Sequence, residues 1–128
     1  MRSETPDIAV ELSLQPYRAF QTDGVIMFSD ILTPLPAMGI EFDVIKGVGP
    51  CIENPIRSAE HLEQLRSIEH PDEVLGFVGE TLRRLRAELQ GEPAALIGFI
   101  GTPWTLAAYC VEGRASKNCL RTKARSFF

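Results

Sequence analysis

The chain has 128 residues, of which 45% are hydrophobic and 23% charged, a composition that suits a globular protein and excludes a disordered or fibrous one. Its formal net charge of −4 argues against broad, salt-dependent nucleic-acid binding and against a polybasic membrane anchor. No run in the sequence approaches the ~20 apolar residues of a membrane-spanning helix, and the length suits one domain.

The first predicted elements are a helix and a buried strand. Thr5-Pro6-Asp7 has the order of a helix start, because a capping hydroxyl precedes a proline at the first helical position and an acid in the first turn. We expect Pro16 to kink or end this helix. Gly24 opens the apolar run 25–28, whose short length and β-branched residues favour a buried strand.

A loop and a hairpin-like excursion are expected next. Residues 33–39 contain two prolines and are predicted to be a loop. Residues 40–54 read as a hairpin, with a strand over 40–45, a Gly-Pro turn and a return strand from Ile52. Ser58 has the side chain to cap a short helix that runs to about Leu65.

The clearest predicted element is a helix that starts at an Asp72 cap and ends at Gly91. Its arginines at 83, 84 and 86 lie largely off the apolar stripe, which indicates a solvated face. The stripe has helical spacing and consists of Val74, Leu75, Val78, Leu82, Leu85 and Leu89.

A second apolar run, 94–100, is followed by a Gly-Thr-Pro turn and a helix over 104–111 that Glu112-Gly113 interrupts. Strand, long helix and strand in this order predict a βαβ unit with parallel strands, and such strands are buried on both faces. Two parallel strands do not cover their own faces and edges. The sequence therefore indicates an α/β protein in which this chain is part of a larger domain, and predicts marginal folding and association of the chain alone.

The cysteines and histidines show no metal-ligand spacing. Cys51, Cys110 and Cys119 are far apart and form no CxxC pair, so we interpret them as free thiols. His61 and His70 are interpreted as surface residues.

No generic catalytic motif is present, so the candidates are polar residues at strand ends. Ser29-Asp30 follows the first predicted strand and Gly101-Thr102-Pro103-Trp104 the second, at the carboxyl ends where parallel α/β folds bind ligands. Asp30 reads equally well as a turn or cap residue. Composition alone favours core positions for Phe99 and Trp104 and a half-buried packing position for Tyr109.

Successive segments of the chain, over about nine tenths of its length, resemble motifs of the uroporphyrinogen decarboxylase family. The residues in these motifs resemble those of the plastid and cyanobacterial branch. FSDIL together with GFxGxPWT is specific. The segments are SLQP (13–16), DGVIMFSDILTPLPAMGIEF (23–42), KGVGP (46–50), PIRS (55–58), LIGFIGTPWTLAAY (96–109) and VEG (111–113).

The resemblance implies a (β/α)8 TIM barrel that works without cofactor or metal. It implies that Asp30 is the catalytic and substrate-binding aspartate, that Tyr109 binds substrate, and that Phe99 and Gly101 line the pocket. The implied reaction removes the acetate carboxyl groups of uroporphyrinogen III to give coproporphyrinogen III in heme and chlorophyll biosynthesis. A carboxylate facing the pyrrole N–H groups would stabilise a cationic ring, and Tyr109 would hydrogen-bond a substrate carboxylate.

The resemblance also implies a homodimer, and the charge and the apolar runs considered above lead us to expect neither nucleic acid nor membrane as a partner. The start of the chain lacks the apolar run of a signal peptide and the Arg and Ser content of a transit peptide. No targeting segment is therefore visible, and both chloroplast and cytoplasm are expected compartments.

Parts of the family pattern are absent from this chain. These are an RQAGRY-type motif, whose arginines hold the substrate carboxylates, a later serine and a C-terminal histidine. We therefore expect residues 1–128 to be an internal fragment, the N-terminal portion of the barrel domain without the first arginine motif and the C-terminal half, and inactive alone. The alternatives are a corrinoid methyltransferase-type relative on the same barrel, and a non-catalytic product that associates with full-length subunits.

Overall fold

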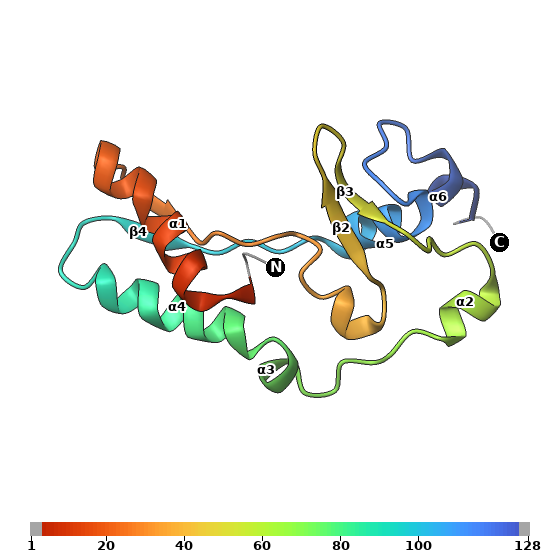
Figure 1. Cartoon of the computed structure of the whole chain (residues 1–128), viewed down its shortest axis with the longest axis horizontal. Helices are drawn as coiled ribbons and strands as arrows, with labels where there is room; N and C mark the ends of the chain where they lie inside the picture. The colour runs from red at the N-terminus through yellow and green to blue at the C-terminus, as the bar shows by residue number, and fades with distance from the viewer. Residues whose placement is uncertain (1–3, 126–128) are drawn as a thin grey trace. The chain divides into compact units, whose positions relative to one another are not determined.

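The computed structural model describes residues 4–125 and divides into two compact units. The first unit contains residues 4–31 and 70–100, and the second contains residues 32–69 and 101–125. Each unit is therefore assembled from two separate stretches of the chain, which Figure 1 shows by their colours. The expectation of one domain over residues 1–128 stays a prediction.

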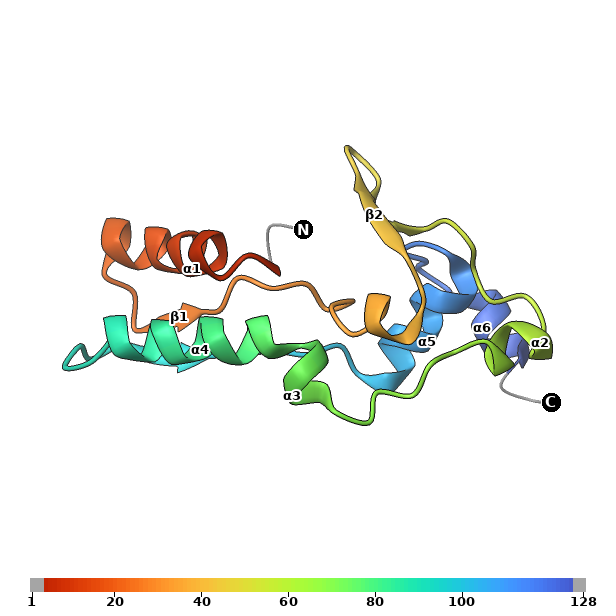
Figure 2. The ribbon, with the colours of Figure 1, turned by 60° about the horizontal axis from the view of Figure 1, so that its bottom comes forward.

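The first unit is built on a pair of parallel strands, β1 (Gly24–Ile26) and β4 (Ala95–Ile97). Their register pairs Val25 with Leu96. Three helices complete the unit, namely α1 (Pro6–Phe20), α3 (Pro71–Val74) and α4 (Gly76–Glu88). Helices α1 and α4 run alongside the strands (Figure 2). The predicted strand–helix–strand order with parallel pairing is confirmed.

The core of this unit lies on one face of the strand pair. Val25 and Met27 are 2% and 4% exposed, whereas Ile26 and Ile97, which point to the other face, are 59% and 47% exposed. The prediction that both strands are buried on both faces is therefore wrong, because α1 and α4 pack against the same face. The core residues are Val10, Leu14, Tyr17, Val25, Met27, Leu85 and Leu89.

The helices of the first unit depart from the sequence prediction at their interruptions. Helix α1 continues through Pro16 to Phe20, so the expectation that proline ends it is wrong. The predicted Asp72 cap is wrong, because Asp72 lies in the first turn of α3 and the N-cap is His70, two residues earlier. The predicted helix then breaks at Leu75, whose φ is −110° and ψ 26°. Beyond this break the predicted apolar stripe is confirmed at Leu85 and Leu89, which are buried.

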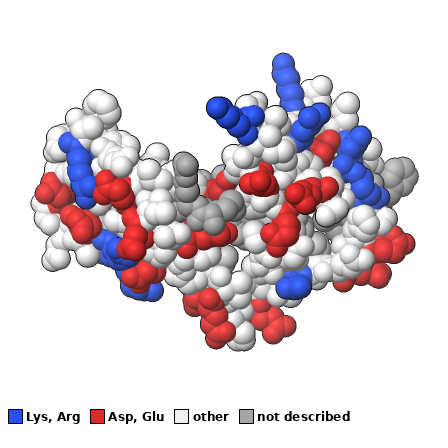
Figure 3. All heavy atoms as spheres, in the orientation of Figure 1, with Lys and Arg blue, Asp and Glu red and all other residues white. Residues whose placement is uncertain are grey.

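Polar contacts connect α1 to α4 and to the segment that follows α4. The Arg84 guanidinium of α4 lies 2.6 Å from the carboxylate of Asp7, and the arginines of α4 form an exposed face as predicted. The Tyr17 hydroxyl donates a hydrogen bond to Glu92 at 2.6 Å, which raises the pKa of Tyr17. Acidic side chains occur over both units on the face drawn in Figure 3.

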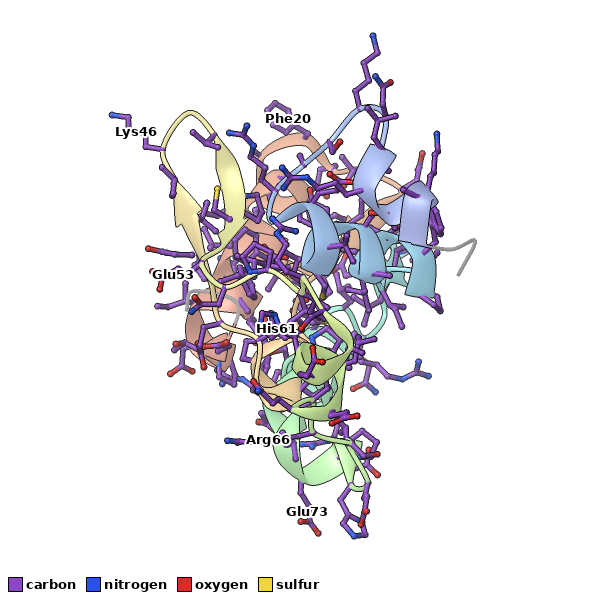
Figure 4. All side chains as sticks on the ribbon, turned by 90° about the vertical axis from the view of Figure 1, so that its right-hand side faces the viewer. Phe20, Lys46, Glu53, His61, Arg66 and Glu73 are labelled. Atoms are coloured by element: carbon purple, nitrogen blue, oxygen red, sulfur yellow. The ribbon has the colours of Figure 1, made fainter. Side chains whose placement is uncertain are left out.

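The second unit contains the predicted hairpin with a different turn. The turn covers residues 46–48, whereas Gly49 and Pro50, expected in the turn, belong to the return strand, which ends at Ile52 rather than beginning there. Strands β2 (Phe42–Ile45) and β3 (Gly49–Ile52) pair antiparallel, and Lys46 at their turn points away from the ribbon (Figure 4). Within the predicted loop, Pro36–Met38 form the 3-10 helix η2. The helices of this unit are α2 (Ala59–Glu63), α5 (Pro103–Glu112) and α6 (Leu120–Arg125). Ser58 precedes α2 as predicted, but its side chain makes no capping hydrogen bond, and the helix ends two residues before Leu65.

Backbone hydrogen bonds join the end of α5 to the hairpin and the segment after it. The Ile52 N–H donates to Gly113 O at 2.7 Å, and the Ile56 N–H donates to Cys110 O at 2.8 Å. The Arg57 guanidinium donates to Val111 O in the last turn of α5. These bonds satisfy carbonyl groups that a helix end leaves without partners in the helix.

The remaining sequence predictions concern thiols, histidines and membrane spans. The three cysteines are free thiols, as predicted, and burial raises the pKa of the Cys110 thiol. His61 and His70 are exposed, also as predicted. Within residues 4–125 no helix is long and apolar enough to cross a membrane, and no group of three His, Cys, Asp or Glu could hold a metal ion.

Candidate active site

The carboxyl ends of β1 and β4 lie side by side in the first unit. Beyond the paired strands, the Met27 N–H donates to Ile97 O at 2.9 Å, so the parallel pairing extends toward these ends. Ser29 and Asp30 follow β1, and Phe99 follows β4. The predicted position of Asp30 at a strand's carboxyl end is therefore confirmed, where parallel α/β folds bind ligands.

Asp30 is half-buried and lies in the irregular segment after β1. A turn over residues 31–35 follows it, in which the Leu35 N–H donates to Leu32 O at 2.9 Å. Both sequence interpretations of Asp30, a site carboxylate and a residue before a turn, agree with this position. Asp30 therefore lies in the short segment of the chain between β1 and this turn.

A hydroxyl that the sequence analysis missed supports the strand end before Asp30. Ser13 in α1 is 4% exposed, and its Oγ accepts a hydrogen bond from the Phe28 N–H at 2.7 Å. The same hydroxyl donates to Ala9 O at 2.6 Å. The sequence did hold a signal for this contact. Ser13 lies on the buried face of the predicted helix, and a buried hydroxyl requires a hydrogen-bond partner.

An open cavity of about 450 Å³ lies along this strand end, between α1 and β1. Phe99 lines it and is 44% exposed, so the expectation from composition that Phe99 is a core residue is wrong. This exposure leaves the side chain available to a ligand. The other lining residues are Leu12, Ser13, Pro16, Tyr17, Thr22, Gly24, Val25, Ile26, Met27, Phe28 and Ser29.

The other two predicted site residues belong to the second unit. Gly101 is buried and precedes α5, whose first turn is capped by the Thr102 hydroxyl, an acceptor for the Thr105 N–H at 3.3 Å. Tyr109 is half-buried on α5 and lines an open cavity of about 250 Å³ together with Trp104. Trp104 is 49% exposed, which also contradicts its expected core position.

Glu112, at the end of α5, supports the segment beyond that cavity. Its Oε1 accepts hydrogen bonds from the Thr122 N–H at 3.0 Å and from the Thr122 hydroxyl at 3.1 Å. The backbone bond is the main cause that lowers the pKa of Glu112 below its ordinary value of 4.5. The carboxylate therefore connects α5 to the first turn of α6.

Glu112→Gln is expected to destabilise the fold at pH 7 and to have a smaller effect in acid. Because the folded-state pKa lies below the unfolded one, the stabilisation by Glu112 is fully present above pH 4.5 and is lost as pH falls through the lowered pKa. Denaturation midpoints of both chains at pH 7 and pH 3 measure this difference. Glu63→Gln, at an exposed position of α2, is the control, and an equal effect there would contradict the assignment.

Comparisons with known proteins support one family. The family model described as "Uroporphyrinogen decarboxylase (URO-D)" matches residues 2–127. Curated proteins named uroporphyrinogen decarboxylase match over 126 residues at 58% identity in Synechococcus sp. CC9902, 56% in Prochlorococcus marinus NATL2A and 55% in Crocosphaera subtropica. These matches cover 98% of this chain and 35% of each relative, so the chain spans about a third of their length.

A solved structure shows the fold. A methyltransferase from Methanosarcina mazei superposes with a TM-score of 0.58 over 86% of this chain and 33% of its own, at 18% sequence identity. At this identity the likeness concerns the fold alone. Together with the parallel β1–β4 pair, it confirms the expected fold class, α/β and part of a (β/α)8 barrel.

Proposed function

The chain belongs to the uroporphyrinogen decarboxylase family, and from this premise we propose that it forms the part of such an enzyme that carries the aspartate at the reacting ring. The proposed reaction converts uroporphyrinogen III to coproporphyrinogen III by removing its acetate carboxyl groups, without cofactor or metal. The observation that carries the proposal is the half-buried Asp30 carboxylate at the carboxyl end of β1, beside the end of β4.

The chemistry requires an electron sink and a group that stabilises it. Protonation of the pyrrole carbon beside the acetate gives a ring cation. The C–C bond between the acetate methylene and its carboxylate then breaks and CO₂ leaves. The electron pair of that bond neutralises the ring. The resulting exocyclic methylene takes up a proton, the ring loses one, and a methyl group remains. A fixed carboxylate at Asp30 would accept hydrogen bonds from the pyrrole N–H groups. Its negative charge, already in place, would stabilise the ring cation electrostatically.

The other predicted residues have binding roles in this proposal. Phe99, on the open face of the first unit, offers an aromatic surface to the macrocycle. The Tyr109 hydroxyl would donate to a substrate carboxylate, and Gly101 would leave space at the pocket wall. The family match supports these roles, since it covers all three residues and the relatives are 55–58% identical over 126 residues.

Both alternative functions have less support. The methyltransferase likeness shows a shared fold at 18% identity, against 55–58% for the decarboxylases. The non-catalytic product is consistent with coverage of 35% of the relatives' length, and co-purification with the intact enzyme would identify it. We propose the decarboxylase as the function because its motifs and chemistry meet at Asp30.

The isolated chain is expected to have no decarboxylase activity, because the substrate-binding arginines that the family resemblance implies lie outside the matched segment. A chimera is expected to be active. In it, this chain replaces the matching segment of the Synechococcus relative, which supplies the remainder of the barrel. Loss of uroporphyrinogen and formation of coproporphyrinogen measure both expectations. The unmodified relative is the control, and a folded but inactive chimera would contradict the proposed function.

Partners and compartment follow from the same proposal. The substrate is a tetrapyrrole, the complete enzyme is a homodimer, and neither nucleic acid nor membrane is a partner. The named relatives come from cyanobacteria, which supports the plastid and cyanobacterial branch and leaves chloroplast and cytoplasm as the proposed compartments.

A further inference from the structure

The hydroxyl of Ser13 in α1 accepts a hydrogen bond from the N–H of Phe28, which lies just after β1 and two residues before Asp30. We propose that Ser13 is a positioning residue, which sets the path of the chain that carries the Asp30 carboxylate. The inference rests on the proposed function, since it assumes that Asp30 acts at the substrate. Its physical basis is the pair of hydrogen bonds that the Ser13 Oγ makes to Phe28 and Ala9.

The Phe28 N–H has a reason to require this partner. Met27 donates its N–H across to Ile97 O in β4, and successive N–H groups of a strand point to opposite edges. The Phe28 N–H therefore points to the edge of β1 away from β4. Ser13 meets it there at 2.7 Å from the buried side of α1.

The orientation of the Ser13 hydroxyl is also determined. Its proton is directed to Ala9 O at 2.6 Å, one turn back in α1, so an oxygen lone pair is left for the Phe28 N–H. At 4% exposure, water does not easily replace either bond. The strand end is thus fixed to a helix of the core rather than to solvent.

The consequence for the candidate site is geometric. Only Ser29 separates Phe28 from Asp30. Just before them, Met27 is bonded to β4 on one edge of the chain and the Phe28 N–H is bonded to Ser13 on the other, so the Ser13 bond contributes to the path that leads to Asp30. Electrostatic stabilisation depends on a carboxylate already in place, and an error of about 1 Å in position can cost about 10²-fold in rate. Loss of the Ser13 bond is therefore expected to appear in kcat.

Ser13→Ala in the active chimera tests the inference. We expect kcat to fall about tenfold or more while KM changes less than about threefold, because the lost bond positions a group for the reacting ring. Hydrogen exchange in a peptide that contains Phe28 is expected to become faster. Ser13→Thr, which keeps the hydroxyl, is expected to restore most of kcat.

Thr81 provides a matched control in the same unit. It is 0% exposed, and its hydroxyl donates to Phe77 O in α4, the same bond to a carbonyl one turn back. Thr81→Val is expected to leave kcat near that of the parent chimera. Equal losses in kcat at both positions would overturn the inference, because general loosening of the core would then explain them.

The remaining outcomes separate the inference from the proposed function. Parent-like kcat or unchanged exchange at Phe28 in Ser13→Ala overturns the role of Ser13, even if Asp30 proves essential. Parent-like activity of Asp30→Asn overturns the proposed function, whatever the exchange at Phe28. If Ser13→Ala does not fold, Ser13→Cys, whose thiol is a weak acceptor, decides: a partial loss of kcat supports the role, and parent-like kcat overturns it.

Discussion

Asp30→Asn in the chimera is expected to lower kcat/KM about 10²–10³-fold, which corresponds to about 3–4 kcal/mol of activation barrier. Losses of this size are seen when an enzyme loses one group that stabilises the charge of the transition state. Asparagine keeps the size of the side chain but removes its negative charge, so the ring cation loses its counter-charge. Asp30→Ala also removes the acceptor oxygens and is expected to lose several kcal/mol. Initial rates of coproporphyrinogen formation measure both variants.

Asp23→Asn is the matched control for this change. Asp23 is an exposed aspartate at the opposite end of β1, where its backbone carbonyl accepts the Ala95 N–H at 2.9 Å. Its substitution keeps that bond and is expected to preserve activity. If Asp30→Asn turns over substrate at nearly the parent rate, Asp30 is not the group that stabilises the ring, and the proposed mechanism fails.

Gly113→Ala is expected to destabilise the fold by roughly 2–5 kcal/mol, the second large effect. The φ of Gly113 is +87°, a left-handed conformation that costs an L-residue about 1–2 kcal/mol. An added Cβ would also lie 2.8 Å from Pro55 Cγ, and relief of such overpacking costs about 1–3 kcal/mol. Denaturant midpoints of the chimera measure the change.

Gly47→Ala separates the two causes. Gly47 has a similar φ of +82°, but nothing lies within 4 Å of an added Cβ. It is therefore expected to lose only the backbone part, about 1–2 kcal/mol. Equal losses at both glycines would show that the contact with Pro55 is harmless, and would contradict the packing argument.

Much of the candidate site could be predicted because its signals are local. Asp30 follows an apolar run that ends in polar residues, and the carboxyl end of a parallel strand is a common place for ligands. Tyr109 was singled out in the same way on the helix after the second run. The burial of Phe99 and Trp104 was predicted wrongly, because composition alone does not show which face of an element lacks a cover.

The sequence by itself determined the elements and their order. Pro6, Gly47 in the hairpin turn and Gly113 act through backbone geometry at their own positions, so the start of the first helix, the hairpin turn and the end of α5 are determined locally. The sequence motifs also indicated the family without the structure, and the family model confirms it.

Only the tertiary structure decided which groups meet. The Ser13 bond to Phe28, the lack of space for a Cβ between Gly113 and Pro55, and the one-sided burial of β1 depend on residues that are far apart in the sequence. Helix and turn signals reach about four residues along the chain, whereas these contacts depend on how whole elements pack. Helix α1 also continues past Pro16 to Phe20, although local propensity allows the helix to end there.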